Sequence, residues 1–132
     1  MGLCLVIVVM IVVGVLAQEG GGITAISAQD ARKLIEKDST VVLLDVRTPA
    51  EWTSETGHLQ HSLLIPVQEL ESRVDELAPY KGRTIIAYCR TGRRSAHAAS
   101  LLTKRGFKVM NLEGGIVKWS SENLPVIKEK AE

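Results

Sequence analysis

Short apolar runs alternate with amphipathic segments along residues 23–127. The sequences VVLLDV at residues 41–46 and TIIAY at residues 84–88 are almost continuously apolar and rich in β-branched residues. Such runs are typical of strands that are covered on both faces, as in a parallel sheet. Shorter runs at residues 63–65 and 108–111 predict two further strands, and residues 23–26 predict an edge strand.

The amphipathic segments between these runs predict helices. Ser27 and Asp30 have the spacing of a helix N-cap and the third residue of the helix that it opens. A later stripe of apolar residues, spaced three and four apart, predicts a helix that ends before Pro79. The helices are expected over residues 27–36, 67–77, about 95–105 and 116–121.

Strands that alternate with helices are typical of βα units. The sequence therefore predicts an α/β fold, with a mostly parallel five-stranded sheet and helices on both faces. In such sheets, binding sites form where the carboxyl ends of strands meet the N-termini of helices. The residues that directly follow the predicted strands are accordingly the first candidates for a functional site.

An apolar leader precedes this folded region. Residues 3–17 carry no charge and are about as long as the core of a signal peptide, but short for a membrane span. Val15 and Ala17 fit the small-residue pattern of a signal-peptidase site, whereas no basic residue precedes the run. We expect export to the periplasm or another extracytoplasmic space, either cleaved after Ala17 or anchored in the membrane by residues 3–17 alone. The expected divisions are a leader over residues 1–17, a flexible joint over 18–22, a folded domain over 23–127 and a charged tail over 128–132.

Composition excludes several classes of function. The net charge is +1, so no overall basic character favours nucleic acid, and no nucleic-acid partner is expected. The two cysteines, Cys4 in the leader and Cys89 in the body, make no disulfide framework. Three scattered histidines lack the spacing of a zinc site, so no metal is predicted.

The candidate site is the segment CRTGRRS, which directly follows the strand at residues 84–88. Cys89 there faces the start of the next helix, where backbone N–H groups lack intrahelical partners and stabilise a thiolate. Gly92 allows the backbone to curl around one centre, and Ser95 is expected to cap the helix. The segment also holds three arginines, which favour a thiolate and an anionic ligand: Arg90, Arg93 and Arg94.

A thiolate in an anion-binding loop can attack the outer sulfur of thiosulfate or a persulfide, or the phosphorus of a phosphate ester. Cysteine phosphatases have an arginine six positions after the cysteine. Here that position is Ser95, and Arg94 lies five positions after Cys89. The loop is one residue short of the phosphatase pattern, and we expect it to be too tight for a tetrahedral phosphate.

Four segments in order resemble the rhodanese domain family, over about residues 23–125. The cysteine segment resembles the family's six-residue active-site loop. Residues 43–47 with Glu51 and Trp52 resemble its DVR segment, residues 57–66 its GHI…NIP segment, and residues 112–119 its GG…W segment. In one departure, Gln60, His61 and Ser62 stand where the family usually has Pro-Gly-Ala.

The resemblance implies a rhodanese-like fold and a two-step sulfur transfer without a cofactor. Cys89 would take sulfur from a small anionic donor such as thiosulfate, and the persulfide would pass it to cyanide, a thiol or a protein acceptor. Asp45 and Arg47 would be framework residues joined by a salt bridge. Residues that would bind the substrate are Arg90, Thr91, Gly92, Arg93, Arg94 and Ser95.

Two other functions stay open beside the sulfurtransferase. One is a carrier or binding module that holds a persulfide for a partner without efficient turnover, and the other is a phosphatase or arsenate reductase. Outside the loop, His58 is expected to make a turn hydrogen bond, His61 to be exposed, and Trp52 and Trp119 to pack in the fold. His97 is expected in the first turn of the helix after the loop, where it would tune the site electrostatically and not act as a general base.

Overall fold

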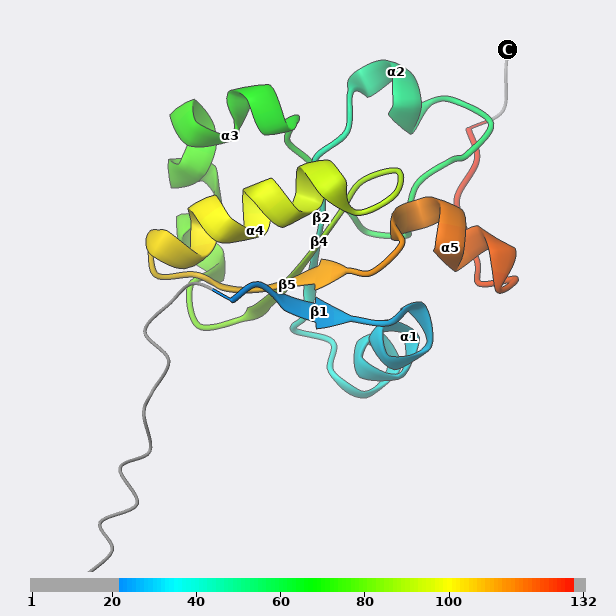
Figure 1. Ribbon diagram of the computed structural model, residues 1–132, viewed down its shortest axis with the longest axis horizontal. Helices are drawn as coiled ribbons and strands as arrows, with labels where there is room; N and C mark the ends of the chain where they lie inside the picture. Colours follow the sequence, from blue (N-terminus) through cyan, green and yellow to red (C-terminus); the bar gives the residue numbers. More distant parts are fainter. Residues whose placement is uncertain (1–21, 130–132) are drawn as a thin grey trace, which may run out of the picture.

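The computed structural model describes residues 22–129, and the predicted leader over residues 1–17 lies outside this range. Five parallel strands form one sheet in the order β1-β5-β4-β2-β3. The predicted α/β fold with an edge strand at its start is therefore confirmed (Figure 1). The strands are β1 (Thr24–Ile26), β2 (Val42–Asp45), β3 (Leu63–Leu64), β4 (Thr84–Tyr88) and β5 (Lys108–Leu112). The helices are α1 (Ala28–Lys37), α2 (Pro49–Trp52), α3 (Val67–Arg73), the 3₁₀ helix η1 (Val74–Tyr80), α4 (Arg93–Lys104) and α5 (Gly115–Ser121).

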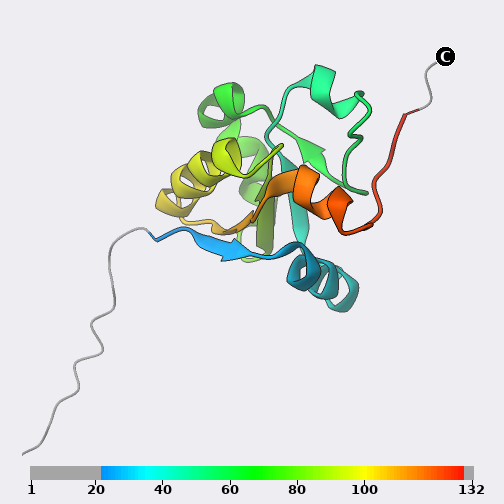
Figure 2. The ribbon, with the colours of Figure 1, turned by 45° about the vertical axis from the view of Figure 1, so that its right-hand side comes forward.

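Helices cover both faces of the sheet, as the continuous apolar runs predict (Figures 1 and 2). On one face, α3, η1 and α4 bury Leu70, Leu77 and Leu102 against the strands. On the other face, α1 and α5 bury their apolar sides, including Trp119. Side chains alternate along each strand, and β2 and β4 are buried on both faces because helices pack against both sides of the sheet. No helix within residues 22–129 is long and apolar enough to cross a membrane.

The predicted helix over residues 67–77 differs from the observed structure. An α-helix covers only Val67–Arg73, and the chain then tightens into η1, which contains Pro79. Proline has no N–H and its ring clashes with the preceding α-helical turn, so the segment around it takes the short 3₁₀ form. Leu70 and Leu77 remain buried, so the apolar stripe was interpreted correctly although the helix type was not.

A short helix, α2, was not predicted. Thr48 caps it by accepting a hydrogen bond from the Glu51 backbone N–H, and the Glu51 side chain bonds back to the N-terminal end, while Pro49 takes the first position. Thr-Pro-x-Glu is the sequence signal of this arrangement. The helix is functionally relevant because it directs the carboxylate of Glu51 towards α4.

The turn over residues 60–62 shows how the chain accommodates its departure from the expected Pro-Gly-Ala. His61 has a φ of 62°, a left-handed conformation that suits glycine and that histidine adopts more readily than most residues. The Ser62 hydroxyl donates to the Leu59 carbonyl, and the Tyr88 hydroxyl donates to Ser62. Ser62 thus connects this turn to the end of β4.

Asp45, the last residue of β2, and Arg47 form a buried ion pair. The Arg47 Nη2 lies 2.7 Å from Asp45 Oδ2, and the two side chains are 1% and 0% exposed. Arg47 also donates to Thr56 Oγ1 and to the Gly57 carbonyl, so it joins β2 to the segment that follows α2. The pair therefore fixes the carboxyl end of β2, beside the end of β4.

Replacing Asp45 with asparagine should destabilise the fold strongly. The substitution leaves the buried Arg47 charge without its counter-ion, which typically costs about 3–5 kcal/mol. Urea unfolding followed by circular dichroism measures the change in the free energy of unfolding. The exposed Asp75→Asn is the matched control and should change it by less than about 0.5 kcal/mol. An equally small effect for Asp45→Asn would show that the ion pair is dispensable.

Candidate active site

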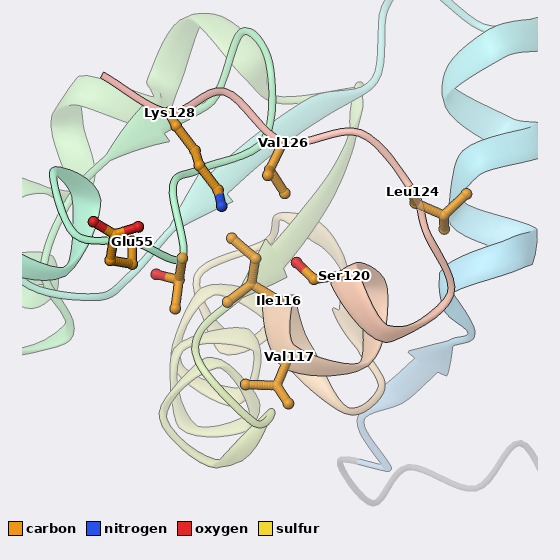
Figure 3. Close-up of a pocket in the computed structure, with 8 residues that line it drawn as sticks. Glu55, Ile116, Val117, Ser120, Leu124, Val126 and Lys128 are labelled. Carbon is orange, nitrogen blue, oxygen red and sulfur yellow. The ribbon is translucent and has the colours of Figure 1, made fainter. Parts of the chain in front are cut away.

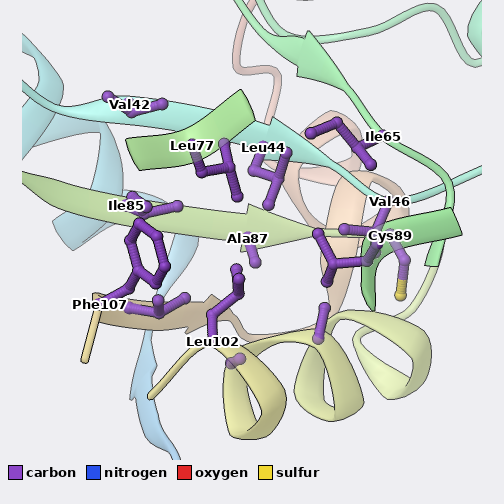
Figure 4. Close-up of a cluster of buried hydrophobic side chains, with 14 residues drawn as sticks. Val42, Leu44, Val46, Ile65, Leu77, Ile85, Ala87, Cys89, Leu102 and Phe107 are labelled. Atoms are coloured by element: carbon purple, nitrogen blue, oxygen red, sulfur yellow. The ribbon is translucent and has the colours of Figure 1, made fainter. Parts of the chain in front are cut away.

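Cys89 lies where the central strand β4 ends and the loop to α4 begins. Its side chain belongs to the core cluster beneath α4 and is 1% exposed. Figure 4 shows the sulfur at the end of this cluster, beyond the end of β4. The loop turns at Gly92, whose φ of 106° is left-handed and favours glycine. This conformation brings the chain back so that the first turn of α4 faces the sulfur.

Hydrogen-bond donors converge on the Cys89 sulfur. The Gly92 backbone N–H donates to Sγ at 3.1 Å, and the Ser95 Oγ lies 3.3 Å from it. Burial alone would raise the pKa of the Cys89 thiol. Hydrogen bonds from the Ser95 hydroxyl and from the backbone N–H groups of Ser95, Gly92 and Thr91 outweigh it, so the pKa is below its ordinary value. The arrangement favours the thiolate form of Cys89 within a cradle of N–H groups.

The expectation that Ser95 caps the helix is wrong. Helix α4 begins two residues earlier, at Arg93, and its N-cap is Gly92. Ser95 is instead the third residue of α4, 0% exposed, with its hydroxyl between Cys89 Sγ and Asn111 Oδ1. The early start follows from the left-handed Gly92, which lets the helix begin immediately after the turn. Ser95 consequently faces the sulfur and not the free end of the helix.

The three arginines of the loop have different environments. Arg90 and Arg93 are exposed. Arg94 is half-buried and makes a two-pronged ion pair with Glu51, at 2.6 and 2.8 Å. The Arg94 guanidinium lowers the pKa of the Glu51 carboxyl to about 2, so the pair is fully charged at neutral pH. Arg94 thus ties the loop to α2, and the free positive charge at the site comes from Arg90 and Arg93.

The start of α5 supports the loop from the other side. The N–H groups of Ile116 and Val117 donate to the carbonyls of Cys89 and Arg90 at 2.9 and 3.1 Å. Gly115 allows this close approach, because a Cβ there would collide with the Arg90 carbonyl, and its φ of 61° is left-handed. Gly115 of the predicted GG…W segment therefore has a steric role behind the loop.

The other candidate residues lie outside the loop. Trp119 is buried, and the Trp52 ring stacks on His58 with centroids 3.6 Å apart, so both tryptophans pack as expected. His58 is buried, and His61 is exposed. His97 is exposed on α4, and none of the hydrogen bonds among residues 22–129 links it to Cys89.

Two residues at the site were not identified as functional from the sequence. Asn111, in β5, donates through Nδ2 to the Gly92 carbonyl at 3.1 Å and accepts from Ser95 Oγ at 2.6 Å. Glu51 was noted only as part of a motif, yet it holds Arg94. Both contacts join segments that are far apart in the chain, so only the capping signal at Thr48 could have drawn attention to this region.

A cavity of about 460 Å³ lies beside α5, between that helix and the C-terminal segment (Figure 3). Its lining includes Ile116, Val117, Val126 and Lys128, but no residue of the loop from Cys89 to Ser95. This cavity is therefore separate from the loop that holds the sulfur. Because Cys89 is nearly fully buried, the loop suits a small donor that presents a single outer atom to the sulfur.

Comparison with known proteins agrees with this geometry. The model of the Rhodanese-like domain family matches residues 27–122. A sulfurtransferase of Allochromatium vinosum is 32% identical over 106 residues, which cover 80% of this chain and 95% of that protein. The putative sulfurtransferase YtwF of Bacillus subtilis is 30% identical and is matched over 78% of this chain and 96% of its own length.

A solved structure shows the same fold. The rhodanese-related protein of Thermoplasma volcanium superposes with a TM-score of 0.72 at 32% identity, over 80% of this chain and 99% of that one. The expected rhodanese-like architecture is therefore confirmed, and the family match spans every segment on which the site is built. The family model matches most of the chain, and a sulfurtransferase is among its relatives. The chain, with its buried cysteine in a loop of converging N–H groups, belongs to the rhodanese-like domain family.

Proposed function

We propose that the protein transfers sulfane sulfur from thiosulfate or a persulfide to a thiophilic acceptor, cyanide or a thiol, through a persulfide on Cys89. The observation that carries the proposal is the convergence of the Thr91, Gly92 and Ser95 N–H groups on the Cys89 sulfur. Such a cradle stabilises a sulfur anion before and after it gains a second sulfur atom. Sulfurtransferase relatives support the reaction class.

In the first step the Cys89 thiolate attacks the outer sulfur of thiosulfate. A new S–S bond forms to Cys89, the S–S bond of thiosulfate breaks, and sulfite leaves with the electron pair. The hydrogen bonds that lower the pKa of Cys89 favour the thiolate, which is the attacking form, so the step is written without a general base. The outer sulfur then lies in the loop, where the N–H groups donate to it.

In the second step an acceptor anion attacks the outer sulfur of the persulfide. The S–S bond to Cys89 breaks, and the electron pair returns to the Cys89 thiolate, which the same N–H groups stabilise. A thiol acceptor leaves as a persulfide and cyanide leaves as thiocyanate. The loop thus holds the negative charge in both resting forms of the enzyme.

Phosphatase chemistry receives no support from the site. The arginine of the loop that would have to face a phosphate is Arg94, and its guanidinium is bound to Glu51 at 2.6 and 2.8 Å. The loop is also one residue shorter than the phosphatase pattern. Both features favour an attack on sulfur.

Thiosulfate should add one sulfur atom to Cys89. In the full chain carrying Cys4→Ser, the intact mass should rise by about 32 Da after thiosulfate and return to its first value after cyanide. The chain has two cysteines, so this background leaves Cys89 as the sole thiol.

The matched control adds Cys89→Ser, which should gain no mass. No gain in either protein, with the fold intact, would rule out thiosulfate as the donor. A stable gain without multiple turnover would favour the carrier module over the enzyme.

Arg90 and Arg93 should attract the thiosulfate anion by their positive charges, and salt should screen this attraction. Replacing either by alanine should raise KM for thiosulfate about fivefold at low salt, since an exposed charge pair contributes about 1 kcal/mol in water. The increase should nearly vanish at about 1 M salt, where the Debye length is roughly 3 Å. Steady-state kinetics at both salt concentrations measure the effect.

Arg94→Ala should behave differently, because Arg94 is bound to Glu51. Its main effect should be a lower kcat that persists at high salt. Arg105→Ala, at the far end of α4, is the matched control and should change neither constant. The same salt dependence for all three loop arginines would contradict the division of roles.

A further inference from the structure

Asn111 occupies a junction between the loop and the first turn of α4. It is half-buried in β5, next to β4, and its amide contacts Gly92 and Ser95. Its Nδ2 donates to the Gly92 carbonyl at 3.1 Å, and its Oδ1 accepts from the Ser95 hydroxyl at 2.6 Å. Asn111 is therefore one side chain away from the reactive sulfur, through Ser95.

The orientation of this amide follows from the partner groups. A backbone carbonyl can only accept, so Asn111 has to turn its NH₂ towards Gly92. Its Oδ1 then faces Ser95, and this oxygen can only accept. Ser95 has a single hydroxyl hydrogen, and it must be donated to Asn111 for the 2.6 Å contact to be a hydrogen bond.

The Ser95 hydroxyl thus has two acceptors and one hydrogen. Cys89 Sγ lies 3.3 Å from the same oxygen, farther than Asn111 Oδ1. With a neutral thiol, all contacts are satisfied in one direction: Cys89 S–H donates to Ser95, and Ser95 donates to Asn111. With a thiolate, the hydroxyl either stays with Asn111 or turns to the sulfur and leaves the amide oxygen without this donor.

We propose that Asn111 is a positioning residue that competes with the Cys89 thiolate for the Ser95 hydroxyl hydrogen, so that the backbone N–H groups are the main donors to the sulfur. The inference rests on Cys89 being the nucleophile of the proposed function. A thiolate with fewer donors is the better nucleophile, because nucleophilicity falls as the pKa of the thiol falls. Asn111 therefore lowers the fraction of Cys89 that is ionised and raises the nucleophilicity of each thiolate.

If Asn111 had only a structural role, replacing it would change the pKa of Cys89 in the opposite direction. If the amide only anchors the Gly92 carbonyl, its removal loosens the loop, moves N–H groups away from the sulfur and raises the pKa of Cys89. The Gly92 carbonyl keeps a second donor, the Ala96 N–H at 3.1 Å, which limits such loosening. The direction of the change thus separates the two roles.

The charged surroundings of Cys89 are the same in every variant of this test, since only neutral side chains are exchanged. Arg94 and Glu51 are paired with each other, and so are Asp45 and Arg47. The exposed titratable groups of the loop and of α4 are Arg90, Arg93, His97 and, at the far end of the helix, Lys104. A change in the titration of Cys89 on substitution at 95 or 111 therefore comes from hydrogen bonding.

The experiment is the rate of alkylation of Cys89 by iodoacetamide as a function of pH, in the full chain carrying Cys4→Ser. Asn111→Leu, which has a similar shape and no polar atoms, should lower the pKa of Cys89 by about one pH unit and raise the thiolate fraction about tenfold below it. The rate at the high-pH plateau should fall about threefold. Asn111→Ala should change both in the same direction.

The deciding comparison repeats Asn111→Leu in a Ser95→Ala background. The lowering of the pKa should disappear there, because no hydroxyl hydrogen remains to redirect. Ser100→Ala, later in α4, is the matched control background and should leave the effect of Asn111→Leu intact. A raised pKa, an unchanged pKa, or a lowering that persists without the Ser95 hydroxyl would each overturn the proposal.

Alkylation needs no sulfur donor, so this test is separate from that of the proposed function. A protein that fails to gain sulfur from thiosulfate can still show the Asn111 effect. Conversely, a protein that forms the persulfide can lack it. The two failures are thus distinguishable.

Discussion

The stabilisation of a negative charge on a sulfur beneath the protein surface is the constraint that the proposed function places on the rest of this structure. Cys89 is 1% exposed, and burial disfavours a thiolate because the charge loses its water. The compensation comes from the Ser95 hydroxyl and from the backbone N–H groups of Ser95, Gly92 and Thr91, around the turn at the left-handed Gly92. These donors point at the sulfur only while the loop keeps its curvature. The contacts that neighbouring helices and strands make with the loop maintain that curvature.

The supports come from every side of the loop. Helix α5 approaches from behind through Gly115 and donates to the Cys89 and Arg90 carbonyls. Helix α2 holds Arg94 through Glu51. Beside β4, the Asp45–Arg47 pair fixes the end of β2. The amide of Asn111, from β5, joins the turn to Ser95 in the first helical turn. The short loop that holds the sulfur is consequently supported by contacts from α2, α5 and β5.

Much of this architecture could be predicted from local patterns, and the remainder depends on contacts between distant residues. The β-branched runs predicted β2 and β4 because both strands are buried on two faces, and the glycine and arginines after Cys89 marked the site. The role of Ser95 was misjudged, since the left-handed Gly92 starts α4 earlier than spacing alone indicates. The partners of Arg94 and Ser95 lie 43 and 16 residues away along the chain, so no periodicity could identify Glu51 or Asn111.

The central claim is that the loop binds a second sulfur atom on Cys89, and a crystal structure of the thiosulfate-treated protein tests it most directly. The account predicts density for one sulfur atom about 2.05 Å from Cys89 Sγ, within hydrogen-bonding distance of the Thr91, Gly92 and Ser95 N–H groups. An unmodified Cys89 in protein that has turned over thiosulfate, or an outer sulfur directed away from the loop, would contradict it.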